Sequence, residues 1–493
     1  MPTIPAPAAH ADKSGYLLKW IIFGACSLAL LVVKFGYHEM WKDEWQAWLM
    51  ARDMGWGQLT ASLFYEGHPA LWYYYLKIWT TVSSMTGLAG DATLQLAHAA
   101  VVIAAYAIFV FKFRLPLWLK ACILPGYYLF FEYGVVNRGY ALVVLLAFLA
   151  TILVKAAGKK PLQMGLVLLL LCQTEVFGAM IACALFFYFL LDRSFFKKPL
   201  VVFKDTGTWQ IFGGLALGLM LFTATVYPRG EQEALSQAYA SVPFSLENIG
   251  TAFQGNLANT FLIGAIPDTN VFGVSAAGVI LSCLVLVLLS YLFWAGRKVW
   301  WTWLAFTVVF FLFGAGVYPG GVRQWGMALV FFVICLELRS VVSPTMNVAR
   351  TVVVVAVLGC QLYYSGMALL KEWQYPFSQA KNAASFILAQ VPGNVPIVAI
   401  NKFAATPVIG YAGRKFYELP KGEAFSYFKW LEKIYLPPEQ ELKLFAQFKK
   451  VGGIVIVTDK PLDPARYPSA RLWKSFDGFN LKNENYYLYA LER

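Results

Sequence analysis

Residues 36–77 read GYHEMWKDEWQAWLMARDMGWGQLTASLFYEGHPALWYYYLK and directly follow the first apolar segment of the chain. This stretch is too polar to cross a membrane, and it carries Asp43, Glu44, Glu66 and His68 among closely spaced Trp and Tyr residues. Such aromatic residues concentrate at membrane–water interfaces. The stretch therefore predicts an interfacial surface that handles a polar ligand, with a carboxylate as general base or metal ligand. The plainer alternative is an amphipathic helix with a solvated acidic edge.

The composition indicates an integral membrane protein. Of the 493 residues, 59% are hydrophobic and 14% are charged, the mean hydropathy is +0.58, and apolar runs repeatedly reach spanning length. The net charge of +13 does not indicate nucleic-acid binding, because most Lys and Arg fall in short loops between apolar runs, where they mark the cytoplasmic side. The seven Cys lie inside apolar runs, which predicts small packed residues and neither disulfides nor a metal cluster.

The basic loops order the apolar runs into about eleven transmembrane helices. The first run follows Lys13 and Lys19 and is expected to be a retained signal anchor that leads outward. If the run 70–88 also crossed the membrane, the basic loop 112–114 would fall outside. We therefore place 70–88 in the outer interface, after which every later basic loop falls inside. The expected spans are 16–35, 93–111, 117–131, 141–155, 162–172, 177–191, 209–227, 272–295, 300–317, 325–338 and 351–370.

After residue 370 no further apolar span appears. Strand-like and helix-like runs alternate there, which predicts a small soluble α/β domain with its own core. The strand-like runs are 396–400, 453–458 and 486–490, and the helix-like runs are 378–390 and 438–450. We therefore divide the chain into a membrane domain, 1–370, and a C-terminal domain, 371–493, which an odd number of spans places outside. The C-terminal sequence carries no glycine-rich phosphate loop, zinc-ligand spacing or nucleophile elbow, so we expect the chemistry in the membrane domain.

The same topology gathers unusual polar residues on the outer side, including those of a long outer loop, 228–270. Glu132, Asn137, Arg138, Tyr140, Glu175, Tyr318, Arg323 and Gln324 are expected there. The spans hold almost no ionisable residue at mid-depth, where transporters and proton relays place them. The alternative for Arg138 and Arg323 is simple snorkelling at a helix end. Two arginines and several carboxylates on the side opposite the basic loops indicate a site instead.

Three motifs carry a family resemblance: residues 41–53 (WKDEWQAWLMARD), 67–73 (GHPALWY) and 137–142 (NRGYAL). In order and separation they resemble the GT-C superfamily of membrane glycosyltransferases, and more narrowly its protein mannosyltransferase and aminoarabinose transferase branch. In that branch the first motif is DE before a helix, the second reads roughly His/Lys-Pro-Pro-Leu-Tyr-Tyr, and the third roughly Arg-Pro-Tyr-Ala-Leu. Ala70 and Gly139 stand where the branch has prolines. The resemblance covers about the first two thirds of the chain.

This resemblance implies an inverting glycosyltransferase that takes a sugar from a polyprenyl-phosphate-linked donor and passes it to an acceptor hydroxyl outside the cytoplasm. Asp43 matches the catalytic carboxylate of the first motif and would serve as the base. Arg138 and Arg323 would neutralise the leaving phosphate, and His68 matches the His or Lys of the second motif. The expected substrate-binding residues are Glu44, Glu66, His68, Glu132, Arg138, Tyr140, Tyr318 and Arg323.

Several points stay open at this level. A divalent cation near Asp43, Glu44, Glu66 and Glu132 is one option, since some members of the superfamily use a metal. A glycan, a lipid or a protein would each fit as acceptor, and the bacterial inner membrane is the expected location. One alternative is a transporter or flippase of a lipid-linked saccharide, which predicts midplane charges or broken helices in paired halves. Another is a non-catalytic membrane scaffold with an external binding domain.

Overall fold

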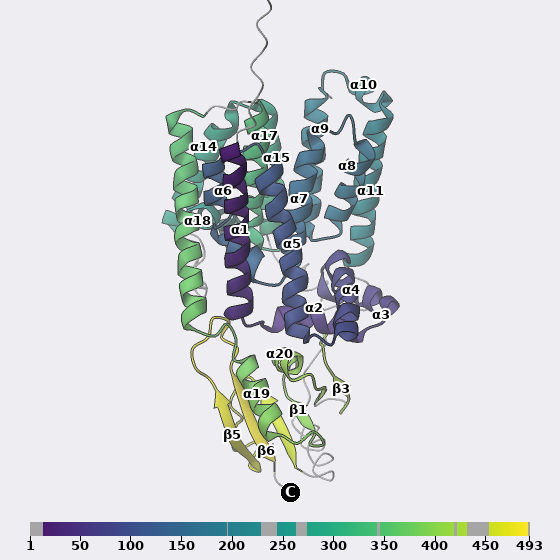
Figure 1. The fold of residues 1–493 in the computed structure, drawn as a ribbon, viewed down its shortest axis with the longest axis vertical. Coiled ribbons are helices and arrows are strands. Elements are labelled where there is room, and N and C mark those ends of the chain that lie inside the picture. Colours follow the sequence, from purple (N-terminus) through teal and green to yellow (C-terminus); the bar gives the residue numbers. More distant parts are fainter. Residues whose placement is uncertain are drawn as a thin grey trace, which may run out of the picture.

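The computed structural model describes residues 13–194, 196–227, 244–262, 274–342, 346–418, 422–430 and 453–491. A bundle of long helices makes up most of the molecule, and a small sheet domain lies at one end of it (Figure 1). Most helices of the bundle are apolar along their whole length, and in the bundle they bury large aromatic and aliphatic side chains. The chain is therefore a polytopic helical membrane protein with a C-terminal α/β domain, as predicted.

Each predicted span has a helical counterpart in the bundle. Among the described residues, seven helical segments are long and apolar enough to cross a membrane: α1 (Lys13–Gly36), α5 (Gly90–Lys112), α11 (Thr206–Val226), α14 (Ala276–Trp294), α15 (Arg297–Gly316), α16 (Val322–Trp325) with α17 (Met327–Val342), and α18 (Val348–Gln374). Three shorter apolar helices lie among them: α7 (Tyr140–Val154), α8 (Pro161–Cys172) and α9 (Val176–Asp192). The short α10 (Pro199–Lys204) connects α9 to α11 at the end of the bundle far from the sheet domain (Figure 1).

The predicted span 117–131 is not one continuous helix, which corrects that prediction. Helix α6 (Leu117–Ile123) ends just before Pro125, and a π-helix, η1 (Tyr127–Val135), follows Gly126. Proline has no backbone N–H and its ring clashes with the preceding turn, so an α-helix cannot continue regularly through it. Long π-helical stretches are rare and occur mostly at functional sites. The break places Glu132 near the end of η1.

The prediction of a long outer loop over residues 228–270 is also partly wrong. Within it, α13 (Leu246–Gln254) and a second π-helix, η2 (Gly255–Asn259), pack against α14 and α15. The Ser245 hydroxyl caps α13 by accepting the Asn248 N–H at 3.1 Å. Because amide side chains interrupt the apolar pattern here, the sequence does not indicate a helix that packs against the bundle. The rest of the predicted loop lies outside the described residues.

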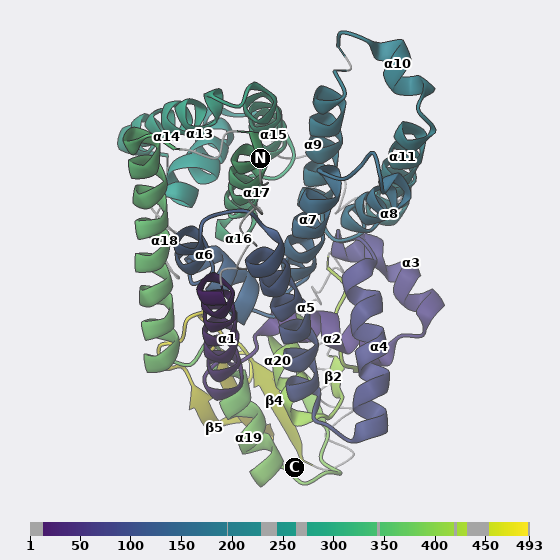
Figure 2. The same ribbon diagram turned by 45° about the horizontal axis from the view of Figure 1, so that its top comes forward.

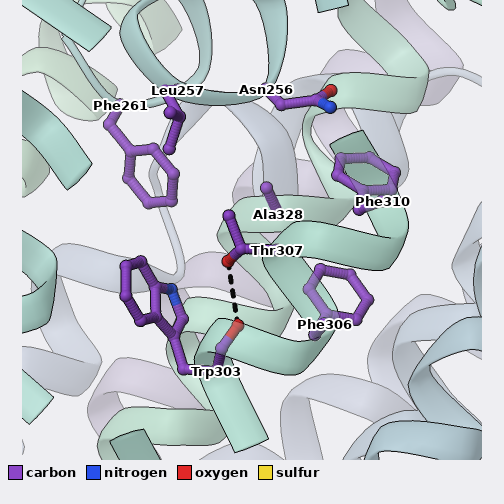
Figure 3. Close-up of a pocket in the computed structure, with 8 residues that line it drawn as sticks. All are labelled: Asn256, Leu257, Phe261, Trp303, Phe306, Thr307, Phe310 and Ala328. Atoms are coloured by element: carbon purple, nitrogen blue, oxygen red, sulfur yellow. Dashed lines mark hydrogen bonds between the residues drawn. The ribbon is translucent and has the colours of Figure 1, made fainter. Parts of the chain in front are cut away.

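A small cavity lies between η2, α15 and α17 (Figure 3). It has a volume of about 10 Å³ and is lined by Asn256, Leu257, Phe261, Trp303, Phe306, Thr307, Phe310 and Ala328. This volume admits at most a single water molecule. The cavity therefore belongs to the packing of the bundle and does not offer room for a substrate.

Three helices from the stretch after α1 lie at the end of the bundle that faces the sheet domain (Figures 1 and 2). They are α2 (Lys42–Asp53), α3 (Trp56–Glu66) and α4 (Leu71–Thr86). Helix α4 has 16 residues and packs against α2 and against α5. Figure 1 shows it beside the lower end of α5, level with α2 and α3. This position agrees with the placement of residues 70–88 at an interface.

The C-terminal domain is built on a six-stranded sheet in the order β3-β2-β1-β4-β6-β5. Strand β1 is parallel to β2 and β4, whereas β3 is antiparallel to β2 and β6 is antiparallel to β4 and β5. The strands are β1 (Ile397–Ala399), β2 (Phe416–Glu418), β3 (Ala424–Phe425), β4 (Ile454–Thr458), β5 (Ala470–Phe476) and β6 (Tyr486–Leu491), with helices α19 (Ala380–Gln390) and α20 (Lys402–Ala412).

The sequence predicted β1, β4, β6 and α19 but not α20 or the other strands. Pro407 lies inside α20, and a proline at such a position argues against a helix when only the sequence is read. The predicted helix 438–450 lies outside the described residues. Helix α18 ends at Gln374, just past the boundary that we placed at residue 370.

The sheet domain docks on α2. The Tyr411 hydroxyl accepts the Met40 N–H at 2.6 Å, and the Gln46 side chain exchanges two hydrogen bonds with the main chain of Phe428 (2.6 and 3.2 Å). Gly410 of α20 lies so close to the Trp45 indole that a Cβ atom there would come within 2.2 Å of the ring. The docking therefore fixes the sheet domain against the helix that begins with the DE motif.

The two ends of the bundle differ in character. At the end away from the sheet domain, Glu337 pairs with Lys155 and accepts the Arg114 N–H at 2.8 Å, and Lys298 pairs with Asp192 at 2.8 Å. The predicted inner loops therefore lie together. Helix α2, whose first turn holds Asp43, and the C-terminal domain lie at the opposite end (Figure 1).

This arrangement predicts that Arg114 and the C-terminal domain face opposite sides of the membrane. In a background without the seven native cysteines, Arg114→Cys and Ser469→Cys both place a thiol at an exposed position. We expect a membrane-impermeant maleimide to label only one of the two from outside intact cells. Lysed cells, in which both should react, serve as the control. Labelling of both positions from outside would contradict the fold.

Candidate active site

Asp43 lies in the first turn of α2, where its carboxylate faces two guanidinium groups from distant parts of the chain. Arg138 Nη1 is 3.4 Å and Arg323 Nη1 is 3.5 Å from Asp43 Oδ2. Arg138 Nη1 also donates to the backbone carbonyl of Asp43 at 3.0 Å. The Asp43 side chain is 14% exposed, so a substrate group can still reach it. The predicted base and both predicted phosphate ligands therefore come together in space.

Arg323 is held in place by its surroundings. Its Nε donates to Glu132 Oε1 at 2.7 Å, and its backbone carbonyl accepts the Tyr133 hydroxyl at 2.6 Å. Glu132 is itself buried and accepts the Tyr127 hydroxyl at 3.1 Å. The turn before Arg323 requires Gly320, whose φ of +73° lies in the left-handed region. Glu132, expected to bind substrate, is thus positioned to orient Arg323.

The two predicted tyrosines differ in accessibility. Tyr140 is buried, and its hydroxyl accepts the Gln324 side-chain amide at 3.2 Å. Tyr318 is 43% exposed and lies close enough to Arg323 and Asp43 to interact with their charges. Tyr318 therefore remains available to a ligand, whereas Tyr140 supports the helix that carries Gln324.

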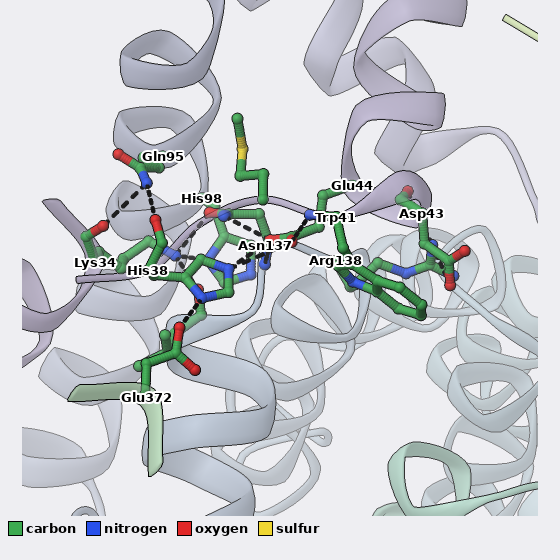
Figure 4. A network of polar contacts seen from close by, with 12 residues as sticks. Lys34, His38, Trp41, Asp43, Glu44, Gln95, His98, Asn137, Arg138 and Glu372 are labelled. Carbon is green, nitrogen blue, oxygen red and sulfur yellow. Dashed lines mark hydrogen bonds and ion pairs between the residues drawn. The ribbon is translucent and has the colours of Figure 1, made fainter. Parts of the chain in front are cut away.

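Glu44 does not occupy the position that we expected for a substrate-binding residue. It is fully buried, and its carboxylate accepts the Asn137 N–H at 2.6 Å, the Asn137 side-chain amide at 2.7 Å and the Trp41 N–H at 3.1 Å (Figure 4). His38 Nε2 is 3.0 Å from the same carboxylate. With its oxygens engaged by protein donors, Glu44 holds the fold together and has no free edge for a substrate.

His38 extends this network in the other direction. Its Nδ1 lies 2.7 Å from Glu372 Oε1 at the end of α18, so the imidazole bridges two carboxylates (Figure 4). Burial opposes ionisation of His38 and of Glu44, but their mutual attraction prevails. The attraction between the two groups lowers the pKa of Glu44. The same attraction, together with that of Glu372, raises the pKa of His38. Lys34 Nζ completes the network by donating to Asn137 Oδ1 at 2.7 Å.

Glu66 and His68 flank the left-handed Gly67 that ends α3. Glu66 is buried and accepts hydrogen bonds from Gln46 Nε2 at 3.2 Å and from the Tyr73 hydroxyl at 3.3 Å. Burial raises the pKa of Glu66 to about 7. His68 Nδ1 lies 2.8 Å from Glu175 Oε2, which raises the pKa of His68 against the opposing effect of burial, and the His68 side chain is 27% exposed.

The carboxylates that we considered as ligands of a divalent cation do not converge. Glu44 is saturated by hydrogen bonds, Glu132 is paired with Arg323, and Asp43 faces two guanidiniums that would repel a cation. Among the described residues, no three His, Cys, Asp or Glu side chains are placed to hold a metal ion together. The donor set therefore does not fit a divalent cation at Asp43.

No family model matches this sequence, and no curated protein matches it. Solved structures do match. The crystal structure of ArnT from Cupriavidus metallidurans bound to undecaprenyl phosphate covers 98% of this chain and 98% of that chain, with a TM-score of 0.51 and 13% identity. ArnT from the same organism in the apo state covers 97% of this chain and 98% of that one, with a TM-score of 0.54 and 12% identity. This chain has the fold of ArnT.

The likeness to ArnT includes the C-terminal domain and so extends beyond the first two thirds of the chain, where the motifs lie. At this identity it is a likeness of fold alone. Within this fold, the site also uses residues that were not among the expected substrate-binding residues: His38, Trp41, Gln46, Asn137, Glu175 and Glu372. Asn137 precedes Arg138 and Glu175 had been placed on the outer side, but no spacing in the sequence links Glu372 to His38.

The buried network leads to a stability prediction for Glu44→Gln. Glu44→Gln removes one of the two carboxylates that His38 bridges, and breaking a buried ion pair typically costs ~3–5 kcal/mol. We expect a much lower apparent melting temperature in detergent. Asp192→Asn, which removes the carboxylate of an exposed ion pair, should change it little. If both variants melted alike, the network would not stabilise the fold.

The same ion pair predicts a pH dependence. Because the pKa of Glu44 is lowered by folding, its contribution is present above the ordinary carboxyl value of 4.5 and is lost as the pH falls further. Because the pKa of His38 is raised, its contribution is present below the ordinary imidazole value of 6.5 and is lost as the pH rises towards about 9. The difference in melting temperature between wild type and Glu44→Gln should therefore be largest between pH 4.5 and 6.5.

Proposed function

We propose that this protein transfers a sugar from a polyprenyl-phosphate-linked donor to an acceptor hydroxyl. The observation that carries the proposal is the position of one accessible carboxylate, Asp43, against the guanidinium groups of Arg138 and Arg323. Transfer to a hydroxyl needs a base and a cationic partner for the leaving phosphate in one place. The ArnT fold supports a lipid-linked donor, since one of those crystal structures holds undecaprenyl phosphate.

In this reaction Asp43 accepts the proton of the acceptor hydroxyl while the hydroxyl oxygen attacks the anomeric carbon of the donor sugar. A new C–O bond forms, the bond between the anomeric carbon and the phosphate oxygen breaks, and its electron pair stays on that oxygen. Polyprenyl phosphate leaves from the face opposite to the attack, so the configuration inverts. The hydrogen bond from Arg138 to the Asp43 carbonyl fixes the position of the first turn of α2 relative to Arg138.

The arginines are suited to the leaving phosphate because guanidinium binds phosphate oxygens through two parallel N–H groups. Glu132 holds the Nε edge of Arg323, which leaves its Nη1 on the side of Asp43. A phosphate that binds both arginines would replace the contacts of 3.4 and 3.5 Å between their Nη1 atoms and the Asp43 carboxylate. These contacts exceed ordinary hydrogen-bond lengths.

The distribution of charge supports an orientation with Asp43 outside the cytoplasm. The basic loops lie together at the far end of the bundle, and positive loops remain on the cytoplasmic side. We therefore propose that the protein resides in a bacterial inner membrane with its site and C-terminal domain on the extracytoplasmic face. In the labelling experiment above, Ser469→Cys should then be the position that reacts from outside. A lipid, polysaccharide or protein hydroxyl would each serve as acceptor.

The transporter or flippase alternative has one observation in its favour, the two π-helical breaks η1 and η2. Transporters bind substrate and coupling ions at such breaks through ionisable groups near the midplane. Here η2 (GNLAN) carries no ionisable side chain, and Glu132 of η1 is engaged by Arg323. A labelled sugar that moves from the lipid onto an acceptor, and not merely across the bilayer, distinguishes transfer from transport.

Asp43→Asn tests the base. The substitution keeps the shape of the side chain but removes its ability to accept the proton, so we expect turnover to fall by ~100-fold or more while donor binding persists. Asp463→Asn, an identical change at an exposed site of the C-terminal domain, should have no effect. Asp43→Asn activity above roughly a tenth of the wild-type rate would argue against Asp43 as the base.

Arg138→Lys and Arg323→Lys test the phosphate site. Both changes keep the charge but replace a planar fork with a point charge, so we expect a higher KM for the donor. Arg323→Lys should be the more severe, because one ammonium cannot reach Glu132 and the phosphate together. Arg52→Lys, in the last turn of α2 where Arg52 pairs with Asp53, is the matched control. Wild-type donor KM in both variants would mean that these arginines only snorkel.

A further inference from the structure

Cationic side chains from three separate parts of the chain lie close to the indole ring of Trp41. Arg323 Cζ lies 5.3 Å from the ring centroid, Lys482 Nζ lies 4.6 Å from it, and Lys42 Nζ lies 5.8 Å from it. Arg323 belongs to the proposed phosphate site, whereas Lys482 comes from the C-terminal domain. Figure 4 shows Trp41 on the side of the polar network where Asp43 and Arg138 lie. A positive charge of the C-terminal domain therefore reaches the candidate active site.

The turn that carries Lys482 is held by several main-chain contacts. The Leu481 N–H donates to the Pro376 carbonyl at 3.1 Å, and the Lys482 N–H donates to the Phe377 carbonyl at 3.0 Å. Asn483 has a φ of +52°, a left-handed conformation that Asn adopts more readily than most other residues. Lys482 Nζ also lies 4.9 Å from the centroid of the Phe377 ring. The backbone and two aromatic rings thus direct the ammonium group towards Trp41.

A count of charges shows why the proposed reaction needs another cation. Before transfer, the two positive charges of Arg138 and Arg323 are balanced by the two negative charges of Asp43 and Glu132. When Asp43 takes up the acceptor proton, the net charge of this set becomes +1. The lipid phosphate changes from a diester with one negative charge to a monoester whose second ionisation has a pKa of about 6. The arginine set alone is therefore one positive charge short of the lipid phosphate, before transfer as well as after it.

We propose that Lys482 supplies this charge as a third cationic ligand of the donor phosphate, carried into the site by the C-terminal domain. The inference rests on the proposed transferase function and names a further ligand of its substrate. Lys42 is less suited, because its N–H and its charge face Glu484. The charge of Lys482 instead acts on Glu132, the carboxylate that holds Arg323.

The test is the binding of undecaprenyl phosphate to the purified full-length protein in detergent, at pH 8 and at pH 5, with undecaprenol as the uncharged probe. We expect Lys482→Met to weaken binding at pH 8 by about tenfold or more, because one ion-pair interaction with the dianion is lost. The loss should be smaller at pH 5, where the phosphate carries a single charge. Lys482→Arg should retain affinity. Lys474→Met, which removes another lysine stacked on an aromatic ring of the same domain, should match the wild type.

Equal affinities of wild type and Lys482→Met for undecaprenyl phosphate at pH 8 would overturn the inference and leave the proposed function standing. A wild-type protein that bound undecaprenyl phosphate no more tightly than undecaprenol would instead contradict the proposed function itself. A thermal melt of each variant establishes that it is folded. If Lys482→Met does not fold, Lys482→Gln provides the same comparison with a polar, uncharged side chain.

Discussion

The burial of the Glu44 carboxylate is the constraint on which the site depends. An ionised carboxylate without water is costly unless it is paired and hydrogen-bonded, so the chain must bring donors to it. His38, the backbone and side chain of Asn137 and the Trp41 N–H provide them. These donors come from the segments before α2 and before α7, and Glu372 adds the end of α18 through His38. One buried charge therefore joins segments that are far apart in the sequence.

The consequence for function lies in the neighbours of these residues. Glu44 follows Asp43, and Asn137 precedes Arg138, so the contact between Glu44 and Asn137 sets the spacing between the acid and the arginine. In each pair, one residue is buried and holds the structure, and the other is partly exposed and available for chemistry. Arg323 is held beside Asp43 by a separate ion pair, in which Glu132 of the π-helix η1 orients the Arg323 guanidinium.

The C-terminal domain has a larger part in this picture than its lack of catalytic motifs indicates. It contacts α2 through Tyr411 and Phe428, and it directs Lys482 at the indole of Trp41, which also lies beside Arg323. Gln46 links this docking to Glu66 through one side-chain amide. The proposed donor site therefore takes charges from the membrane domain and from the sheet domain.

The sequence by itself determined the membrane class, the order of the spans, the division into two domains and the candidate set Asp43, Arg138 and Arg323. These features follow from local sequence patterns: hydropathy over the length of a helix, basic loops, and short motifs whose residues are neighbours. The tertiary structure alone decided that Glu44 is buried, that Pro125 divides a span, that residues 246–259 form helices packed against the bundle, and that Glu372 and Lys482 approach the site. Those outcomes depend on desolvation and on contacts with residues far along the chain. Neither effect produces a periodic pattern that can be read from the sequence.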